Sequence, residues 1–322
     1  MKVCDHVNFG EWQEIAEKCD YATFFHTPAW SKVFAKTYPK MSIETKKIIF
    51  DDGKAIIFPL VRRKAAGIFD TYSSNIAGVY GGWIARRNIS KEQIDLVTEW
   101  ANKNFSNFTW RINPFDHSLK GLGDAITRKD FTQYIDLRQG FDHIYEKWTR
   151  GHASAVKKAQ KDGVTVKQAD SWAEWEKYFE IYQDSIKRWG KKTSSRYPLE
   201  LFGNLFQEKS ENIKLWLAYF DKKPIGGALC LYNNHHVDYW HGAALVGYFK
   251  RKPSNLLQYE IIKNACGGGY WWYDFNPSGG HEGVIRFKKS FGAEMVSADI
   301  ISKEERLKKT ICSLLNNIKR IR

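Results

Sequence analysis

Hydrophobic and polar positions alternate along the chain with two different periods, which predict a mixture of helices and strands. Apolar residues recur at helical spacing over residues 9–19. A second helix is expected over 28–37, because Pro28 suits a first turn. Residues 43–50 and 55–61 predict the two strands of a hairpin, joined by an Asp-Asp-Gly-Lys turn.

The second half of the chain repeats the order of the first. Ser90 and Gln93 predict a capping box that opens a helix, and a strand follows over 108–114. Ser254 is expected to cap the corresponding helix in the second half. The remaining predicted elements are strands over 214–220, 225–232, 235–244 and 270–277, and helices over 141–161, 171–188 and 254–266. The matched spacing favours a degenerate internal duplication, although such units also recur by chance in α+β chains.

Length and composition indicate a globular protein of about two domains. The chain has 322 residues, of which 43% are hydrophobic and 27% charged, so disorder is excluded as the dominant state. Aromatic residues reach 15% and favour aromatic-walled clefts, although core packing explains much of such an excess. We expect domains over 1–145 and 146–302, with a basic amphipathic helix over 303–322 that packs back on the first domain or touches RNA or an anionic membrane.

The charge balance indicates an anionic partner. The formal net charge is +14, and residues 141–322 carry most of the excess. Nucleic acid, an anionic membrane surface and phosphorylated small molecules are the expected classes of partner. Five cysteines without a CxxC motif, and Asp5 where a signal peptide needs an apolar run, predict a cytoplasmic protein.

The stretch 271–293 is the densest in candidate chemistry. A predicted strand ends at Pro277, and a glycine-rich turn follows, with Arg286 and Lys288 shortly after it. Such a turn lets the backbone approach a ligand, and the cations suit a phosphate or a developing oxyanion. The alternative is a surface turn followed by a solvated basic helix. Asp274, at the end of the strand, is a candidate for relaying a proton, or else a structural cap on the turn.

Two other segments carry basic residues, and several enzyme classes are disfavoured. Residues 151–164 predict a basic helix, which either binds phosphate or is a solvated face. A basic loop at 250–252 leads into a helix N-terminus, which is a ready anion site. The chain lacks a Walker A motif, a G-x-G-x-x-G motif and a G-x-S-x-G elbow, which weakens kinase, NTPase, dehydrogenase and serine hydrolase interpretations. No histidine cluster has zinc-like spacing, so a metal is not expected.

Taken together, the ordered motifs resemble the FemAB/FemX family of peptidoglycan-bridge aminoacyltransferases. The motifs that carry the resemblance are Phe25-His-Thr-Pro-Ala-Trp30, 156–164, Lys223-Pro-Ile-Gly-Gly227, Tyr239-Trp-His-Gly-Ala243, 252–258, Asp274-Phe-Asn-Pro-Ser-Gly-Gly280, Phe287-Lys288 and Phe291-Gly-Ala293. The resemblance implies an α/β (α+β) fold of two tandem GNAT-like domains, each with a mixed, mostly antiparallel sheet flanked by helices. It also implies transfer of an amino acid from aminoacyl-tRNA to an amine of a UDP-linked or lipid-linked cell-wall precursor, with no resident cofactor.

The resemblance also carries over residues. Phe287 and Lys288 match a Phe-Lys pair that lines the acyl-transfer site in that family, so Lys288 would stabilise the oxyanion or the RNA 3′ end. With Asp274 they are the candidate catalytic residues. The candidate binding residues are Lys32, Lys157, Lys158, Tyr239, His241, Ser278, Gly279 and Arg286. The alternative is an acyl-CoA-dependent N-acyltransferase acting on a sugar nucleotide or a surface polysaccharide precursor. The segment 244–257 lacks the glycine run that cradles the pyrophosphate of coenzyme A, which argues against that alternative.

Overall fold

A computed structural model describes residues 1–65, 69–74, 76–122, 125–190 and 196–304. The described residues fold into two compact units, Met1–Asp130 with residues 297–304, and Phe131–Val296. The boundary falls earlier than the expected residue 145, because the strand after Asp130 pairs within the second unit. The chain also returns to the first unit before residue 302. The helix predicted over 303–322 lies almost wholly outside the described residues.

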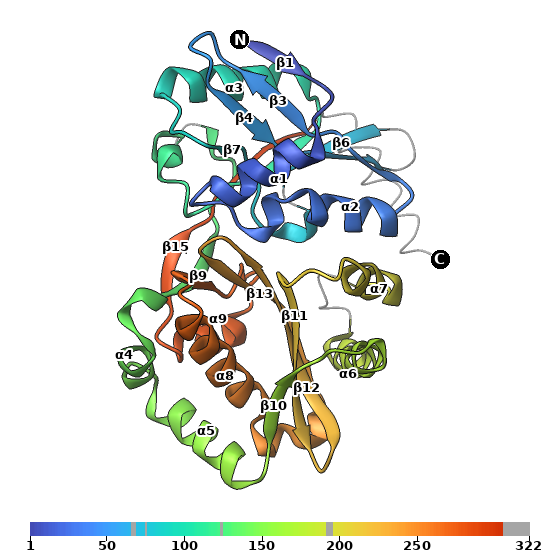
Figure 1. Cartoon of the computed structure of the whole chain (residues 1–322), viewed down its shortest axis with the longest axis vertical. Coiled ribbons are helices and arrows are strands. Elements are labelled where there is room, and N and C mark those ends of the chain that lie inside the picture. The colour runs from blue at the N-terminus through green and yellow to red at the C-terminus, as the bar shows by residue number, and fades with distance from the viewer. Residues whose placement is uncertain (66–68, 75, 123–124, 191–195, 305–322) are drawn as a thin grey trace. The chain divides into compact units, whose positions relative to one another are not determined.

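The first unit contains two sheets and flanking helices (Figure 1). The strand orders are β1-β3-β4-β7 and β16-β8-β6-β5-β2. The strands are β1 (Lys2–Cys4), β2 (Met41–Ile43), β3 (Lys46–Ile49), β4 (Ala55–Phe58), β5 (Val61–Ala65), β6 (Phe69–Ser73), β7 (Ile84–Ala85), β8 (Phe108–Arg111) and β16 (Ile300–Lys303). The helices are α1 (Phe9–Lys18), α2 (Pro28–Thr37) and α3 (Lys91–Asn104), with short 3₁₀ turns η1 (Phe24–His26), η2 (Ile76–Gly78) and η3 (His117–Gly121).

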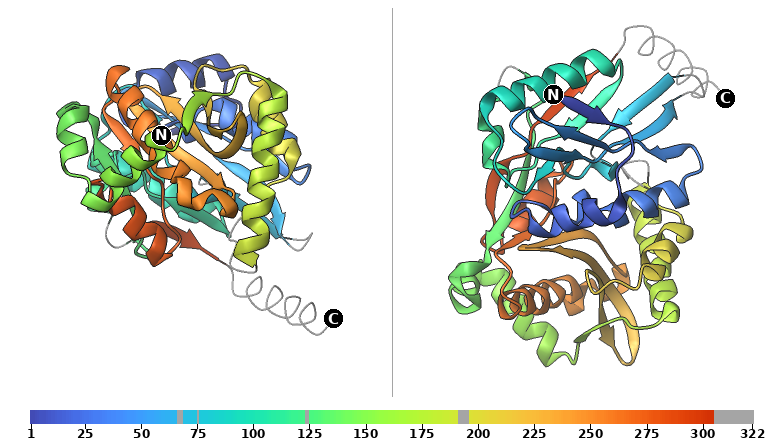
Figure 2. Two further views of the ribbon diagram at one scale, coloured as in Figure 1. Left: turned by 90° about the horizontal axis from the view of Figure 1, so that it is seen from below. Right: turned by 45° about the horizontal axis from the view of Figure 1, so that its top comes forward.

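Strand β4 separates two cores in this unit. Its side chains alternate, so Ile56 and Phe58 join the core that includes Val97 of α3. Ile57 points the other way and packs with Trp12 and its neighbours in α1. The helices α1 and α3 therefore cover opposite faces of the β1-β3-β4-β7 sheet, as two views of the ribbon show (Figures 1 and 2).

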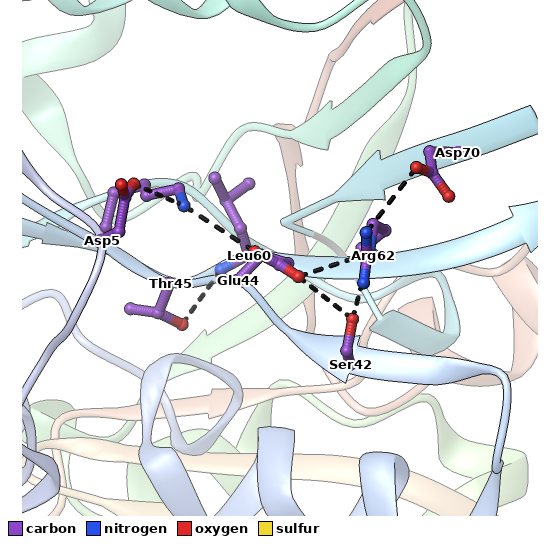
Figure 3. Close-up of polar contacts among 8 residues, drawn as sticks. Asp5, Ser42, Glu44, Thr45, Leu60, Arg62 and Asp70 are labelled. Atoms are coloured by element: carbon purple, nitrogen blue, oxygen red, sulfur yellow. Dashed lines mark hydrogen bonds and ion pairs between the residues drawn. The ribbon is translucent and has the colours of Figure 1, made fainter.

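The two sheets of the first unit are continuous through one bent hairpin. Strands β2 and β3 are consecutive in the chain but belong to different sheets, and the same is true of β4 and β5. At the bend, Glu44 N donates to Leu60 O at 2.8 Å, and Leu60 N donates to Thr45 Oγ1 at 3.3 Å. Arg62 forms ion pairs with Glu44 at 3.3 Å and with Asp70 at 3.7 Å (Figure 3). Backbone and ionic contacts thus hold the bend.

The second unit is built on one mixed sheet with the order β10-β11-β12-β13-β14-β9-β15. The strands are β9 (Phe131–Asp136), β10 (Thr165–Gln168), β11 (Ile213–Phe220), β12 (Lys223–Asn233), β13 (His236–Ala244), β14 (Trp272–Asp274) and β15 (Glu294–Ser297). The helices are α4 (Phe141–Glu146), α5 (Arg150–Lys161), α6 (Trp172–Trp189), α7 (Leu199–Gln207), α8 (Pro253–Gly267) and α9 (Glu282–Lys289), with 3₁₀ turns η5 (Leu137–Gln139) and η7 (Val246–Arg251).

Helices cover both faces of this sheet. Helix α8 packs over β11–β13, and α5 packs against α8 on the same side of the sheet. Helices α6 and α7 lie on the other face (Figure 1). The core on the α8 side includes Ala228, Cys230 and Tyr232 of β12, together with Ile261 and Ile262 of α8. Strands β13 and β14 are parallel neighbours joined through α8, and their C-terminal ends lie at the same edge of the sheet.

The expected fold class is confirmed, and several local predictions hold. The order strand–turn–strand–strand–helix–strand occurs in β11–β12–β13–α8–β14. Ser90 and Gln93 form the predicted capping box of α3. The predicted cap at Ser254 is wrong, because α8 begins at Pro253 and its N-cap is Lys252 in the left-handed conformation. The helix predicted over 141–161 is two helices, since the chain turns at residues 147–149. Among the described helices, none has the length and apolar character needed to cross a membrane.

Candidate active site

The predicted catalytic residues gather where β13 and β14 diverge. The two strands pair in parallel from His236–Trp272 to Asp238–Asp274, and no pairing between them is found beyond that point in the described residues. Beyond that point the side chain of Asn276 links the end of β14 to β13, because its Nδ2 donates a hydrogen bond to Tyr239 O at 3.1 Å. The end of β14, the turn after it and helix α9 thus form one side of the site.

Asn276 is held in an uncommon conformation. Its φ is +60°, in the left-handed region, which asparagine tolerates better than most residues. The residue is 6% exposed, and its side-chain Oδ1 has no hydrogen-bond partner among the described residues. The bond from Nδ2 to Tyr239 fixes which end of the amide is the oxygen. The site therefore contains an unused, buried acceptor.

Lys288 is buried, although the adjacent Lys289 on α9 is exposed. Only 4% of Lys288 is exposed, and its Nζ donates to Asn276 O at 2.5 Å. Burial lowers the pKa of Lys288 to about 8, and the nearby Asp274 carboxylate opposes that shift. At neutral pH this lysine is mostly an ammonium ion that lies close to losing its proton. The surface alternative, a solvated basic helix, is therefore wrong for Lys288.

Asp274 is fully buried and lies at the centre of the local hydrogen bonds. Its Oδ1 accepts from Thr132 Oγ1 at 2.8 Å and from Asn276 N at 2.7 Å. The bond from Asn276 N makes Asp274 a structural cap on the turn, which is one of the two roles that the sequence allowed for it. Asp274 also favours the charged form of Lys288. Asp274 therefore positions Asn276 through a hydrogen bond and raises the pKa of Lys288 through its charge.

The glycine-rich turn leads into α9 as expected, but the cations lie at the far end of that helix. Gly279 and Gly280 have positive φ values of 57° and 77°, and Ser278 is nearly buried. Arg286 is exposed and, like Lys288, belongs to the last turn of α9, away from the backbone N–H groups of its first turn. The Lys288 ammonium group nevertheless reaches back to the start of this turn at Asn276 O, whereas no side-chain contact of Arg286 with the turn is found among the described residues.

Phe287 packs beside the site rather than into solvent. Its ring centre lies 4.9 Å from that of Phe291 and 5.4 Å from that of His152 on α5. His152 is in turn hydrogen-bonded to Asn255 of α8, with 3.0 Å between Nδ1 and Nδ2. Phe287 thus packs α9 against α5, and His152 links that contact to α8, which helps to hold Lys288 in place.

A β-bulge separates the environments of Tyr239 and His241. Leu229 of β12 pairs with His241 and Cys230 pairs with Tyr239, so β13 carries one extra residue. Tyr239 contacts Phe275, with ring centres 6.1 Å apart. His241 Nδ1 instead shares a 2.6 Å hydrogen bond with the hydroxyl group of Tyr178 on α6, and desolvation lowers its pKa to about 3. Tyr239 therefore belongs to the Lys288 site, and His241 belongs to an aromatic cluster on α6 and α7.

The remaining candidates are dispersed. Lys157 and Lys158 lie on the exposed face of α5, and Lys158 is bound to Asp162 at 2.8 Å. Lys32 belongs to the first unit, where its Nζ lies 4.1 Å from the centre of the Phe9 ring. Their predicted role in phosphate binding stays a prediction.

Sequence reasoning missed residues that the fold brings to the site. Thr132 and Gln133 are adjacent on β9, and Thr132 lies 142 positions before Asp274 in the sequence. Gln133 Nε2 donates to Ile285 O in α9 at 3.1 Å, and Phe275 N donates to Gln133 O at 2.9 Å. No local pattern points to them. Asn276 could have been singled out only by residue type, because asparagine tolerates the left-handed conformation better than most residues.

The features expected of a coenzyme A site differ from what is observed. The loop between β13 and α8 is the 3₁₀ turn η7 followed by Lys252, without a run of glycines. Within the described ranges, no group of three or more His, Cys, Asp and Glu residues could hold a metal ion.

Comparisons with known proteins agree with this architecture. Residues 148–289 match the family model described as an acetyltransferase (GNAT) domain. The crystal structure of FemX superimposes with a TM-score of 0.73 at 14% identity, and the match covers 98% of this chain and 99% of that chain. The C-terminal domain of a putative lysylphosphatidylglycerol synthetase from Agrobacterium fabrum gives a TM-score of 0.58 at 10% identity, covering 95% and 96%. L-PGS from Bacillus licheniformis gives 0.52 at 12% identity, covering 87% and 93%. No curated protein sequence matches the chain.

These comparisons fix the fold and the enzyme class. The whole chain has the fold of FemX, so the resemblance to the Fem-type tandem GNAT fold is confirmed. The family match lies in the second unit and contains Asp274 and Lys288, which makes that unit an acyltransferase domain of the GNAT type.

Proposed function

We propose that this protein transfers an amino acid from aminoacyl-tRNA to an amine of a peptidoglycan or related cell-envelope precursor. One observation carries the proposal: a buried lysine, Lys288, lies in the GNAT domain with its ammonium group fixed on Asn276 O at 2.5 Å. A fixed cation in a water-poor site is what the tetrahedral intermediate of acyl transfer requires. The fold likeness to FemX supports the Fem type of acyltransferase.

In the proposed reaction the neutral amine of the acceptor attacks the ester carbonyl of the aminoacyl-tRNA. The new C–N bond forms while the carbonyl oxygen becomes an oxyanion. Lys288, as an ammonium ion, donates a hydrogen bond to that oxygen. Collapse of the intermediate breaks the C–O bond to the ribose, and the proton lost by the amine leaves with the ribose hydroxyl group. The products are an amide and deacylated tRNA.

The other site residues act by positioning Lys288. Asp274 holds the turn through Asn276 N and favours the charged form of the lysine. Phe287 holds α9 against His152 and Phe291. Tyr239 is attached through its main-chain oxygen to Asn276. These contacts hold the ammonium group before substrate arrives, which lowers the cost of reorganisation during the reaction.

The basic excess of the second half supports tRNA as donor. Residues 141–322 hold more of the chain's 50 basic side chains than residues 1–140 do, and Lys157 on α5 is exposed. Phosphate contacts of this kind carry most of the affinity of proteins for nucleic acids. The absence of a glycine run between β13 and α8 in the described chain speaks against coenzyme A as donor.

The proposal is tested by measuring transfer with mass spectrometry. Purified protein is mixed with a UDP-linked muropeptide and a pool of charged tRNAs, and a parallel reaction contains acetyl-CoA instead. A precursor heavier by one amino acid, and absent after RNase treatment, is the expected result. An acetyl increment would replace the proposal with the acyl-CoA alternative. Absence of both products with UDP-linked and lipid-linked precursors would refute a cell-wall acceptor.

Lys288 and Lys289 provide a matched pair for this assay. They are adjacent on α9, but Lys288 is buried and Lys289 is exposed. Lys288→Ala is expected to abolish transfer, whereas Lys289→Ala should retain it. Equal loss in both variants would show that general positive charge on α9, rather than the buried ammonium group, supports the activity.

A further inference from the structure

An exposed apolar tip lies on the turn η7, which joins β13 to α8 in the second unit. Val246 is 55% exposed, Phe249 is 43% exposed and Trp189 at the end of α6 is 38% exposed. Single exposed apolar residues need no explanation, but a group of three large ones marks an interaction surface. We call Val246, Phe249 and Trp189, with the cations Arg188 and Lys250, the η7 surface.

The geometry of η7 makes these side chains point outward together. A 3₁₀ helix has three residues per turn, so Val246 and Phe249 lie on the same side. No residue of η7 is buried. The backbone of the turn is nevertheless fixed, because Tyr248 N donates to Leu245 O at 3.0 Å and Lys252 N donates to Phe249 O at 3.1 Å. The apolar tip is thus a built feature rather than an unfolded end.

Cations surround the tip. The Arg188 guanidinium lies 4.8 Å from the ring centre of Phe249 and 5.9 Å from that of Trp189. Beside them, Arg251 lies 4.3 Å from the ring centre of Phe220, and Lys223 lies 5.4 Å from that of Tyr248. Arg251 also forms a 3.4 Å ion pair with Asp162, whereas Lys250 and Lys252 are exposed. The local charge is positive.

We propose that the η7 surface docks on membranes that contain anionic lipids. Val246, Phe249 and Trp189 would enter the interface between headgroups and acyl chains, and Arg188 and Lys250 would contact lipid phosphates. This arrangement matches the chemistry of the bilayer surface, where aromatic rings lie at headgroup level and cations are attracted by the negative surface potential. The proposal does not depend on the proposed function.

RNA is the competing partner for a basic, aromatic surface, and two observations disfavour it. Bases stack on free ring faces, whereas Arg188 already lies over the two rings of this surface, those of Phe249 and Trp189. Val246, the most exposed of the three apolar residues, has no ring and gains nothing from a base or a phosphate. It gains from transfer into an apolar phase.

The test is sedimentation of the full chain with phospholipid vesicles. We expect binding to vesicles that contain roughly a third phosphatidylglycerol, and little binding to pure phosphatidylcholine. The double variant Val246→Ser/Phe249→Ser should weaken binding at least about tenfold, because it removes the inserted apolar area. Lys250→Glu should weaken binding most at low salt, where charge is least screened. Circular dichroism and thermal melting check that the variants fold.

Leu96 provides the matched control, because it is 45% exposed on α3 of the first unit. Leu96→Ser should leave vesicle binding unchanged. The proposal is overturned if the wild-type chain does not bind the anionic vesicles, or if Leu96→Ser and the double variant reduce binding equally. It is also overturned if the double variant weakens binding of tRNA and leaves vesicle binding intact, which would assign the surface to RNA. A change of oligomeric state in the double variant, with unchanged vesicle binding, would assign it to a second copy.

Discussion

The Nζ atom of Lys288 and the main-chain oxygen of Asn276 lie 2.5 Å apart in a site that leaves only 4% of the lysine exposed. The contact joins the last turn of α9 to the turn that ends β14. It fixes a cation at the point where two parallel strands separate.

The charge of Lys288 should set the upper limit of the pH range for transfer. Burial lowers the pKa of Lys288 to about 8, so the ammonium form is lost as the pH rises through that value. Transfer should fall at least about a hundredfold in Lys288→Ala at pH 7, since one oxyanion donor contributes at least that much. Lys288→Arg should retain more of its neutral-pH rate above pH 8 than the wild type, because arginine stays protonated. Initial rates between pH 6 and pH 10, normalised to pH 7, measure the effect. A wild-type rate that does not decline relative to Lys288→Arg would contradict it.

Asp274 should control the pKa of Lys288. The Asp274 carboxylate favours the ammonium form, so Asp274→Asn should lower the pKa of Lys288 further and move the decline in rate below pH 8. The asparagine can still accept the bond from Thr132, which limits structural damage. Glu282→Gln is the control, because Glu282 is an exposed carboxylate in the first turn of the same helix. A purely structural role for Asp274 would reduce the rate without moving the midpoint.

Asn276 should contribute through both its backbone and its side chain. Asn276→Gly removes the bond to Tyr239 O but tolerates the φ of +60°. Asn276→Ala loses the same bond and adds left-handed strain, so it should be less stable than the glycine variant by about 1 kcal/mol. Urea denaturation of the two variants measures the difference. Equal stabilities would mean that the turn relaxes when the side chain is absent.

The first unit should lose stability in mild acid through His26. This side chain is fully buried, and desolvation lowers its pKa from 6.5 to about 4. Because the unfolded state binds the proton more readily, the free energy of unfolding falls as the pH drops below 6.5 and continues to fall until about pH 4. Between pH 7.5 and pH 5 the loss should be about 2 kcal/mol.

The matched variants for that prediction are His26→Gln and His6→Gln. His26→Gln removes the buried group and should remove this pH-dependent part of the loss, whatever its own effect on stability. His6 is exposed, so His6→Gln should behave like the wild type. The free energy of unfolding is measured at both pH values for each protein. An undiminished loss in His26→Gln would place the acid-sensitive group elsewhere.

The sequence by itself determined many of the local elements and pointed to the stretch that we propose carries the chemistry. The bounds of α2 and the capping box of α3 follow from residues within four positions of each other, and both were predicted. The path from Asp274 through the glycine turn to Lys288 is also local. Hydrogen bonds and steric limits within one turn depend on near neighbours alone, so the pattern of near neighbours suffices.

Only the tertiary structure decided how those groups are used. Lys288 and Lys289 are adjacent and of the same residue type, and no local pattern predicts that Lys288 is buried and Lys289 is exposed. Thr132 reaches Asp274 only because β9 pairs with β14. The β-bulge that assigns Tyr239 and His241 to different surroundings depends on the register with β12. Burial, register and pKa are set by chain segments that are distant in sequence and meet in the folded core, so no local pattern contains them.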